Sequence, residues 1–326
     1  MNQIKIDIHK TPEKYQSTKE ELRKDNCLSE RNKELILNFL RDAELGKTVL
    51  YKQKKEIGKR TCLKYLHNLK TIGHFLRKDF DKVSSKDMDE FIYALKDDAI
   101  TKKNKAPYSS ETKRDFKIIL KKFYKWLLGN NEIYPDLVKC LDTFQKPKQP
   151  IAVTTKQVEK IVRAARTDLE KAVVSILFDL GARVEEFLNV RIENVHIAKN
   201  WYKIQLPFSK TFSRTLPLDR SIPYLKCWLQ IHPYQQGQVF PISYNQCLNT
   251  LKRLGKQTLG IEITPQIIRH SKATQLAQAG VGRYQMCEWM GWAMSSKMPD
   301  RYIRREGIDN QKTLEMIKHR EAQLEG

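Results

Sequence analysis

Four short segments of the chain carry side chains suited to chemistry on a phosphate. Arg183 follows a glycine at a predicted helix end in GARVEEFLNV, Lys210 lies in the SKT of a predicted hairpin, and Arg269 lies in TPQIIRHS. Trp292 and Tyr302 belong to MGWAMSSKMPDRYIRR. Cleavage of a phosphodiester needs a nucleophile in line with the leaving oxygen, and cationic donors on the non-bridging oxygens, where charge collects in the transition state. These residue types meet that requirement.

Two arginines form the predicted phosphate clamp. A guanidinium group binds two oxygens at once and keeps its charge, so Arg183 and Arg269 together would hold one phosphate. A lone arginine on a helix is usually solvated surface, but Arg183 begins an apolar segment and Arg269 lies in a helix that also packs a core. Glu186, three residues after Arg183, has the spacing to hold that arginine's planar group.

A helix is predicted over residues 264–276, TPQIIRHSKATQL, because Thr264 is a good N-cap and a proline takes the first helical position. Gln266, Arg269 and His270 stand at i, i+3 and i+4 and therefore share one face. A phosphate near this helix start would also be favoured by the helix dipole. For His270 alone, a structural histidine is an equally good interpretation.

Tyr302 is the candidate nucleophile and Lys210 the candidate general acid. A phenol titrates at about pH 10 and needs nearby positive charge to attack as a phenolate. The departing 5′ oxygen must be protonated, and neighbouring arginines would lower a lysine's pKa for this task. Arg214 or Lys203 is the alternative acid, in which case Lys210 would contact backbone phosphate. Trp292 could donate its indole N–H to a phosphate oxygen or serve as a core aromatic.

These residues, in this order and context, resemble the catalytic set of the tyrosine recombinase (integrase) family, which runs Arg, Lys, His-or-Lys, Arg, His-or-Trp, Tyr. The resemblance covers about residues 30 to 310, and Trp292 with the MPDRY form is similar to the archaeal branch. The resemblance assigns Glu186 and His270 supporting roles at the site. Gln266 departs from the pattern, because the family commonly has His or Lys there and a neutral amide neither takes a proton nor carries charge.

The resemblance implies a site-specific DNA recombinase that cleaves and rejoins double-stranded DNA through a 3′-phosphotyrosyl intermediate. That bond keeps the free energy of the phosphodiester, so no ATP, cofactor or metal is expected, and the sequence has neither a P-loop nor carboxylates clustered at metal-binding spacing. It also implies a homo-tetramer on two duplexes, assembled from monomers or dimers through a Holliday junction, with residues 308–325 docking on a neighbour. By analogy, integration of a mobile element is favoured over chromosome-dimer resolution.

Two other interpretations remain open. A type IB topoisomerase resembles this family in fold and phosphotyrosine chemistry, but would relax supercoiled DNA as a monomer and without regard to sequence. A DNA-binding accessory factor that has lost turnover is the second alternative, and Gln266 is the residue that suggests it.

Composition supports a nucleic-acid partner and an intracellular location. The 326 residues contain 60 Lys+Arg against 38 Asp+Glu, a formal charge of +22, which is typical of a protein that neutralises phosphates. The six cysteines are far apart and form no C-x-x-C pair, which indicates reduced thiols rather than a zinc site. The polar start and the lack of any run of 18 apolar residues disfavour secretion and membrane spanning, so a cytoplasmic protein is expected.

These residues must be positioned by helices and strands, and the sequence patterns predict a mainly α fold with a small β-hairpin or sheet. Residues 1–28 lack periodicity and predict a loosely held N-terminal arm, whereas apolar stripes over 29–142 predict a helical bundle. The resemblance identifies this bundle as a SAM-like core-binding domain that grips DNA. Residues 143–155 contain two prolines and few apolar residues, and predict a linker. Residues 156–326 form the expected α-rich catalytic domain with its C-terminal tail, and alternation within 201–218 predicts the hairpin.

Overall fold

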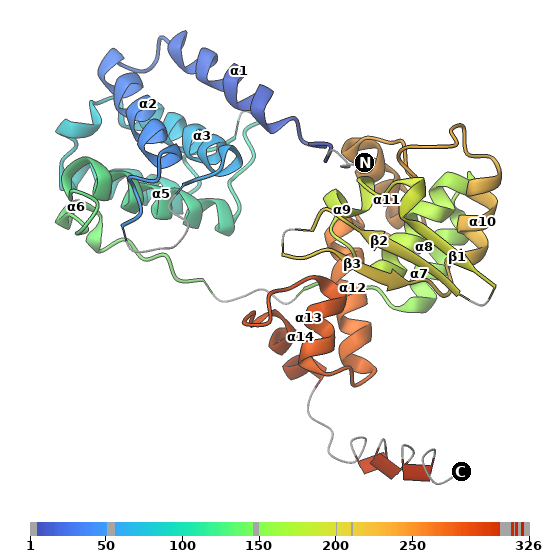
Figure 1. The fold of residues 1–326 in the computed structure, drawn as a ribbon. Helices are drawn as coiled ribbons and strands as arrows, with labels where there is room; N and C mark the ends of the chain where they lie inside the picture. Colours follow the sequence, from blue (N-terminus) through green and yellow to red (C-terminus); the bar gives the residue numbers. More distant parts are fainter. Residues whose placement is uncertain are drawn as a thin grey trace. The chain divides into compact units, whose positions relative to one another are not determined.

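The chain folds as two compact units, which we call the helical unit, Lys10–Lys148, and the mixed unit, Met1–His9 with Gln149–Gly326. The computed structural model describes residues 5–50, 56–102, 104–145, 150–199, 201–209 and 211–306, together with the pairs 314–315, 317–318 and 321–322. The architecture is mainly α with one small sheet, as the sequence predicts (Figure 1). The division between the units falls inside the linker predicted over 143–155.

The helical unit consists of helices packed around α3. Its elements are α1 (Thr11–Arg23), α2 (Glu30–Glu44), α3 (Lys59–Leu76), η1 (Phe80–Lys82), α4 (Ser85–Lys96), α5 (Ser110–Leu128) and α6 (Asp136–Lys139). Side-chain caps start three of these helices, since Ser29, Ser84 and Ser109 each accept a hydrogen bond from a first-turn backbone N–H. Each such cap stabilises its helix by about 1 kcal/mol and sets where it begins.

Aromatic side chains dominate the core of the helical unit. The Phe123 ring meets the edge of Phe39 at a centroid distance of 5.3 Å and that of Phe80 at 5.0 Å, and all three rings are fully buried. Burial of each such side chain stabilises the fold by about 1.5 to 3 kcal/mol. This core joins α2, η1 and α5, which lie far apart in the sequence.

The N-terminal residues differ from the loosely held arm that the sequence predicts for 1–28. Residues 11–23 form α1, which packs on α3 and buries Tyr15, Thr18 and Leu22. The apolar positions are too few and too widely spaced in a charged stretch to show a stripe, so the helix depends on its tertiary contact with α3.

Residues before α1 belong to the mixed unit. The Ile6 backbone N–H donates to Asn189 Oδ1 at 2.7 Å, and Asn189 Nδ2 donates back to the Ile6 carbonyl at 3.0 Å. Lys5 pairs with Glu185 at 2.8 Å, and Ile8 packs against the core of the mixed unit. The chain therefore passes between the two units twice, once after residue 9 and once near residue 149.

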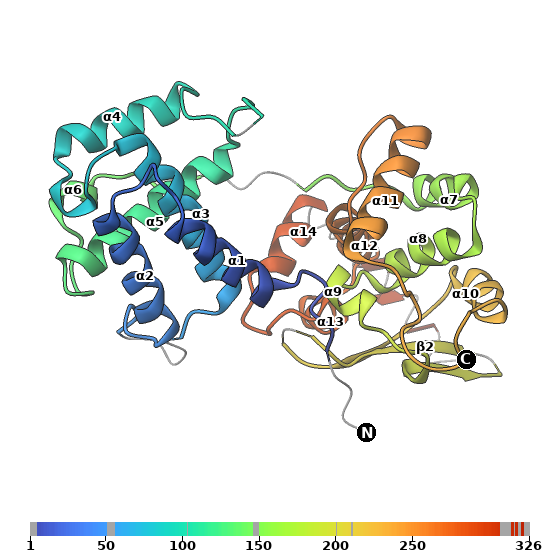
Figure 2. The same ribbon diagram turned by 90° about the horizontal axis from the view of Figure 1, so that it is seen from above.

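The mixed unit packs helices on both sides of the buried helix α8 and adds a small sheet (Figures 1 and 2). Its helices are α7 (Thr155–Ala164), α8 (Asp168–Leu180), α9 (Val184–Leu188), η2 (Ile192–Asn194), α10 (Ile222–Gln230), α11 (Tyr244–Leu259), α12 (Pro265–Gln278), α13 (Arg283–Met290) and α14 (Met298–Glu306). Its strands are β1 (Val195–Ala198), β2 (Trp201–Leu206) and β3 (Arg214–Pro217). Every residue of α8 from Ala172 to Leu180 is buried, so this helix is the centre of the core.

The sheet is antiparallel in the order β1-β2-β3. β2 and β3 form the predicted hairpin, with Leu206 opposite Arg214 beside the turn. β1 pairs along the other edge, with Val195 opposite Ile204. The burial of its four residues does not alternate along the strand, so pairing with β2 rather than local pattern makes it a strand. In the described part of the chain, none of the helices has the length and apolar character needed to cross a membrane.

Candidate active site

The site begins where helix α8 ends and helix α9 begins. Gly181 caps α8 with a positive φ of 58°, and a Cβ there would lie 2.7 Å from Lys272 Cγ, so glycine is required for both reasons. The tight turn brings Arg183 to the N-cap position of α9, directly after α8. Arg183 is therefore held by two helix ends rather than by a flexible loop.

The Glu186 carboxylate is the centre of the cluster and is only 2% exposed. Its Oε1 accepts from Arg183 Nη1 at 2.7 Å, and its Oε2 accepts from Arg214 Nη2 at 2.9 Å. Burial alone would raise the pKa of this carboxyl, but the hydrogen bond and charge of Arg214, with the backbone N–H and charge of Arg183, outweigh it and hold the pKa at about 2. Glu186 is therefore ionised at neutral pH and orients two guanidinium groups.

Arg183 and Arg269 meet at the end of helix α13. Arg183 Nη2 donates to the Gly291 carbonyl at 2.9 Å, and Arg269 Nη2 donates to the preceding carbonyl, that of Met290, at 2.5 Å. Arg269 Nη1 also donates to the Gly181 carbonyl at 2.7 Å. Two residues 86 positions apart (269 − 183) thus bind consecutive carbonyls, which brings the two predicted clamp arginines together.

Arg214 is a third arginine of this cluster and is 7% exposed. Its Nε donates to the Trp289 carbonyl at 2.8 Å and its Nη1 to Ser209 Oγ at 3.2 Å, in addition to its pair with Glu186. The sequence suggests Arg214 only as an alternative general acid, whereas its donors are taken up by holding Glu186 and the end of α13. The available signal is its alternation with Leu216 and Leu218, which marks an arginine on the buried face of a strand.

Gly291 allows Arg214 to approach the end of α13. Its φ is 60°, and a Cβ there would lie 2.5 Å from Arg214 Nη1. Any side chain at this position would displace the guanidinium group from Glu186.

The cluster has an excess of positive charge. Arg183 and Arg214 each pair with the Glu186 carboxylate, whereas Arg269 interacts with it through charge alone and donates to backbone carbonyls. Burial, followed by the charge of Arg183, lowers the pKa of Arg269. Holding this charge in the protein is costly, and a bound anion would relieve the cost. The arrangement favours a phosphate.

Tyr302 lies on α14 beside this cluster and is 1% exposed. Its ring stacks on Trp292 with centroids 5.8 Å apart and an angle of 14° between the planes. The Trp292 ring lies 5.7 Å from Arg269 Cζ, so Trp292 links the candidate nucleophile to an arginine of the clamp. α14 packs on α12 and α13 of the same unit (Figures 1 and 2).

His270 contacts the Tyr302 hydroxyl through ring atom Nδ1, in a hydrogen bond. On its other side, His270 Nε2 lies 3.1 Å from the side-chain nitrogen Nε2 of Gln266, one helical turn earlier. Burial, then the charges of Arg301 and Arg269, lowers the pKa of His270 to about 4. The ring is therefore neutral at physiological pH.

Lys210, the candidate acid, lies outside the residues that the structure describes. Its two neighbours both contact the cluster. Ser209 Oγ donates to Glu186 Oε1 at 3.0 Å, and Thr211 Oγ1 donates to the Gly291 carbonyl at 2.9 Å. Lys203, the other alternative acid, lies on β2 with Nζ 4.5 Å from the centre of the Trp201 ring.

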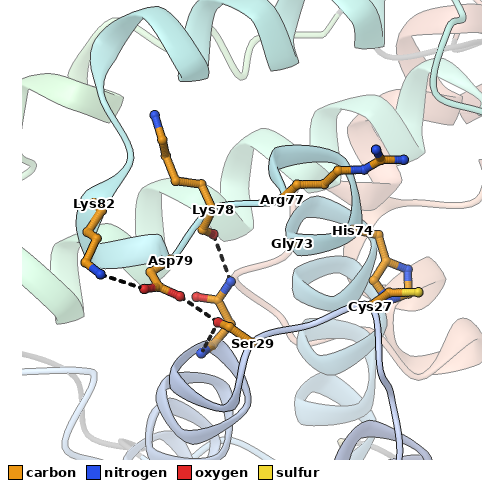
Figure 3. A pocket seen from close by; sticks show the side chains of 9 residues that line it. Cys27, Ser29, Gly73, His74, Arg77, Lys78, Asp79 and Lys82 are labelled. Carbon is orange, nitrogen blue, oxygen red and sulfur yellow. Dashed lines mark hydrogen bonds and ion pairs between the residues drawn. The ribbon is translucent and has the colours of Figure 1, made fainter.

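A cavity of about 740 Å³ lies in the helical unit and holds none of the predicted site residues (Figure 3). Its polar lining is internally bonded: Asp79 pairs with Lys82 at 2.9 Å and accepts from Ser29 Oγ at 2.6 Å, while Asn32 donates to the Lys78 carbonyl at 2.9 Å. Within the described ranges, no group of three or more His, Cys, Asp and Glu side chains is placed to hold a metal ion.

The fold brings Arg183, Arg214 and Arg269 together around Glu186, beside a buried tyrosine. Residues 152–307 match the model of the phage integrase family. All eight predicted site residues lie in this range, and the match supports the resemblance to the tyrosine recombinase family.

Curated relatives agree with this assignment. The chain is 25% identical to the tyrosine recombinase XerA of Saccharolobus solfataricus over 72% of this chain and 79% of that protein. It is 28% identical to XerA of Pyrococcus horikoshii over 52% of this chain and 64% of that protein.

Solved structures share the fold. A XerH site-specific recombinase bound to its difH substrate superposes with a TM-score of 0.62 at 17% identity, over 89% of this chain and 98% of that one. A lambda integrase dimer bound to a core site gives a TM-score of 0.63 at 14% identity, over 84% of this chain and 78% of that one.

Proposed function

We propose that this protein is a site-specific DNA recombinase or integrase that cleaves and rejoins double-stranded DNA through a 3′-phosphotyrosyl bond at Tyr302. The observation that carries the proposal is the meeting of Arg183 and Arg269 at the end of α13, with Trp292 stacked between Arg269 and Tyr302. The match to the phage integrase family model and the similarity to curated tyrosine recombinases support the same reaction.

Each residue has a distinct task in the proposed reaction. Arg183 and Arg269 bind the non-bridging oxygens of the scissile phosphate and neutralise the charge that builds up there. Glu186 holds Arg183 in place, and Trp292 packs the nucleophile against the clamp. Tyr302 attacks phosphorus, and Lys210 protonates the departing 5′ oxygen.

The tyrosine and the arginines belong to one chain and one unit, which favours attack by each protomer on the DNA that it binds itself. α14 packs on α12, the helix that carries Arg269, and Tyr302 is part of a buried cluster with Met286, Met290 and Trp292. We further propose that a homo-tetramer forms on two duplexes. A lambda integrase tetramer bound to a Holliday junction shares the fold of this chain, with a TM-score of 0.62.

The covalent bond can be trapped directly. Incubation with nicked duplexes, in buffer with a chelator, is expected to yield a protein–DNA adduct that resists denaturation. Tyr302→Phe should form none, whereas Tyr284→Phe, which changes an exposed tyrosine of α13, should form the wild-type amount. Absence of adduct with wild-type protein across a library of sequences would leave only a DNA-binding protein.

A second assay separates recombination from relaxation. A recombinase exchanges strands between two copies of its site and shows little activity on other plasmids. A topoisomerase relaxes any supercoiled plasmid. Relaxation of unrelated plasmids at a rate independent of sequence, without exchange, would contradict the proposal.

A further inference from the structure

The proposed attack needs an acceptor for the Tyr302 proton. A phenol attacks phosphorus only as its proton leaves, and nearby positive charge lowers the cost without removing the proton. Gln266 stands where the tyrosine recombinase pattern usually has His or Lys, and an amide takes no proton at neutral pH. Another group must therefore receive it.

His270 has the geometry for this task. Its Nδ1 is hydrogen-bonded to the Tyr302 hydroxyl, and the two rings lie 6.0 Å apart between centroids at an angle of 36°. The contact joins α12 to α14, which pack along one another (Figure 1). Hydrogen-bond contact between a base and a nucleophile is the first requirement of general-base catalysis.

Gln266 determines which ring nitrogen can accept. A neutral imidazole has one nitrogen that donates and one that accepts. The Gln266 side-chain nitrogen lies 3.1 Å from His270 Nε2, and in this orientation it donates to Nε2 and leaves the ring hydrogen on Nδ1. The oxygen and nitrogen of an amide occupy nearly the same positions, so turning the Gln266 amide by half a rotation places its oxygen against Nε2 without moving the contact. With its carbonyl oxygen on Nε2–H, the amide fixes the tautomer in which Nδ1 carries the lone pair that faces Tyr302.

We propose that His270 is the general base that takes the Tyr302 proton, and that Gln266 is the positioning residue that fixes the tautomer of His270. This inference rests on the proposed recombinase function. Gln266 and His270 together thus replace the ionisable residue that position 266 lacks.

The positive charges around His270 keep its ring unprotonated, so that it can accept a proton. Arg269 on its own helix and Arg301 on α14 act after burial to disfavour the protonated ring. A bound phosphate would neutralise part of the arginine charge, so DNA binding raises the basicity of His270 when the reaction needs it. Binding of the substrate thereby makes His270 a stronger base.

Other cations on α12 do not compete for this task. The Lys272 ammonium donates to Gln275 Oε1 at 3.0 Å and lies 4.9 Å from the centre of the Trp289 ring. The Arg269 guanidinium is held by the carbonyls of Gly181 and Met290 and has no lone pair to offer.

The proposed step balances without a co-reactant. The bond from Tyr302 Oη to phosphorus forms as the bond from phosphorus to the 5′ oxygen breaks. The phenol proton passes to His270 Nδ1, and the 5′ oxygen receives a separate proton from the acid, assigned to Lys210. In rejoining, the 5′ hydroxyl attacks phosphorus and gives its proton back to the acid, while the bond from phosphorus to Tyr302 Oη breaks and His270 returns its proton to the phenol oxygen.

Single-turnover cleavage with His270→Asn tests the base. The shorter amide places a polar atom where Nδ1 lies but cannot take a proton, and we expect the rate to fall roughly 10²- to 10⁴-fold with little change in DNA affinity. His196→Asn, an exposed histidine on β1, is the matched control and should keep the wild-type rate. Thermal melting of both variants checks that the fold is intact.

A modified substrate separates the base from the acid. Sulfur in place of the bridging 5′ oxygen leaves without protonation, so it should restore cleavage to Lys210→Ala but not to His270→Asn. Added imidazole should partly restore His270→Ala, and Gln266→Leu should lower the rate by a smaller factor while leaving affinity unchanged. The acid limb of the pH–rate profile should also disappear in His270→Asn.

The inference is overturned if His270→Asn cleaves within about threefold of the wild-type rate, or if the sulfur substrate rescues it as fully as Lys210→Ala. Either result leaves the recombinase function standing. Failure of the wild-type protein to form any adduct would instead remove the proposed function and this step with it.

Discussion

Glu186 shows how one side chain organises several others. It is nearly inaccessible to solvent, and its two oxygens are shared between Arg183 and Arg214. Replacing it with a neutral group would leave Arg183 and Arg214 without their ion-pair partner, and breaking a buried ion pair in this way typically costs about 3 to 5 kcal/mol.

The pKa of Glu186 predicts a specific acid dependence. Its folded-state pKa of about 2 lies below the usual value, so its contribution is present above about pH 4.5 and is lost as pH falls through about 2. We expect Glu186→Gln to lower the free energy of unfolding by about 3 kcal/mol at neutral pH, with the gap to wild type closing in acid. Denaturant titrations from neutral to acid pH measure the free energy of unfolding of both proteins.

Glu288→Gln, which changes an exposed carboxylate on α13, is the control and should leave the free energy of unfolding unchanged across the same pH range. A gap between Glu186→Gln and wild type that stays constant down to about pH 2 would mean that the carboxylate contributes through shape rather than charge.

Gly291 offers a second test at the level of single residues. Gly291→Ala adds the strain of a positive φ, about 1 kcal/mol, and a clash with Arg214. Gly260→Ala has the same helix-end conformation with no atom within 4 Å of the added Cβ, so it carries the strain alone. We expect Gly291→Ala to lose more stability than Gly260→Ala, and only Gly291→Ala to lose adduct formation, by roughly tenfold or more. Equal adduct yields would show that Arg214 tolerates displacement.

At the scale of elements, the site is made of helix ends. The C-terminal carbonyls of α8 and α13 accept from Arg183 and Arg269, and α12 supplies the polar face with Gln266 and His270. Helix ends are where backbone groups lack partners within the helix, so they are natural binding points for guanidinium donors. The start of α12 sets the rotation of that polar face.

The cap of α12 should therefore matter more for activity than an equivalent cap elsewhere. Thr264 Oγ1 accepts from the Ile267 backbone N–H at 3.2 Å, and Ser243 Oγ caps α11 in the same way from Gln246 at 3.2 Å. Thr264→Ala and Ser243→Ala should each cost about 1 kcal/mol of stability. Only Thr264→Ala is expected to slow cleavage, by severalfold, because its first turn carries Gln266. Equal rates for the two variants would argue against this role.

At the scale of the whole molecule, the chain connects its two units at two points. Asn189→Ala would leave the Ile6 backbone N–H and carbonyl without their partner, at a cost of about 1 to 3 kcal/mol. We expect faster hydrogen exchange and earlier proteolysis at residues 5–9 in this variant. Asn245→Ala, on the exposed face of α11, is the control. Unchanged protection of residue 6 would show that Lys5 and Ile8 hold the segment without Asn189.

The formal charge of +22 predicts that DNA affinity is dominated by phosphate contacts. For about six to ten contacts, affinity should fall roughly 10³- to 10⁵-fold between about 50 mM and about 200 mM salt. Fluorescence anisotropy with a labelled duplex measures the slope. A change of less than about threefold would mean that phosphate contacts contribute little.

Local pattern was sufficient for much of the fold. The start of α12 at Thr264, the hairpin over β2 and β3, and the helix stops at glycines all follow from caps, alternation and backbone preference, which act within a few residues. The spacing of Arg183 and Glu186 within one turn predicted their ion pair for the same reason.

Only the tertiary structure decided what these residues meet. α1 and β1 depend on contacts with distant elements, and the carbonyls of Met290 and Gly291 carry no sequence signal because every residue has one. The place of Arg214 beside Glu186, and of His270 against Tyr302, required packing of strands and helices far apart in the chain. Residue types and local geometry are written in the sequence, whereas the distances between segments depend on the folded core.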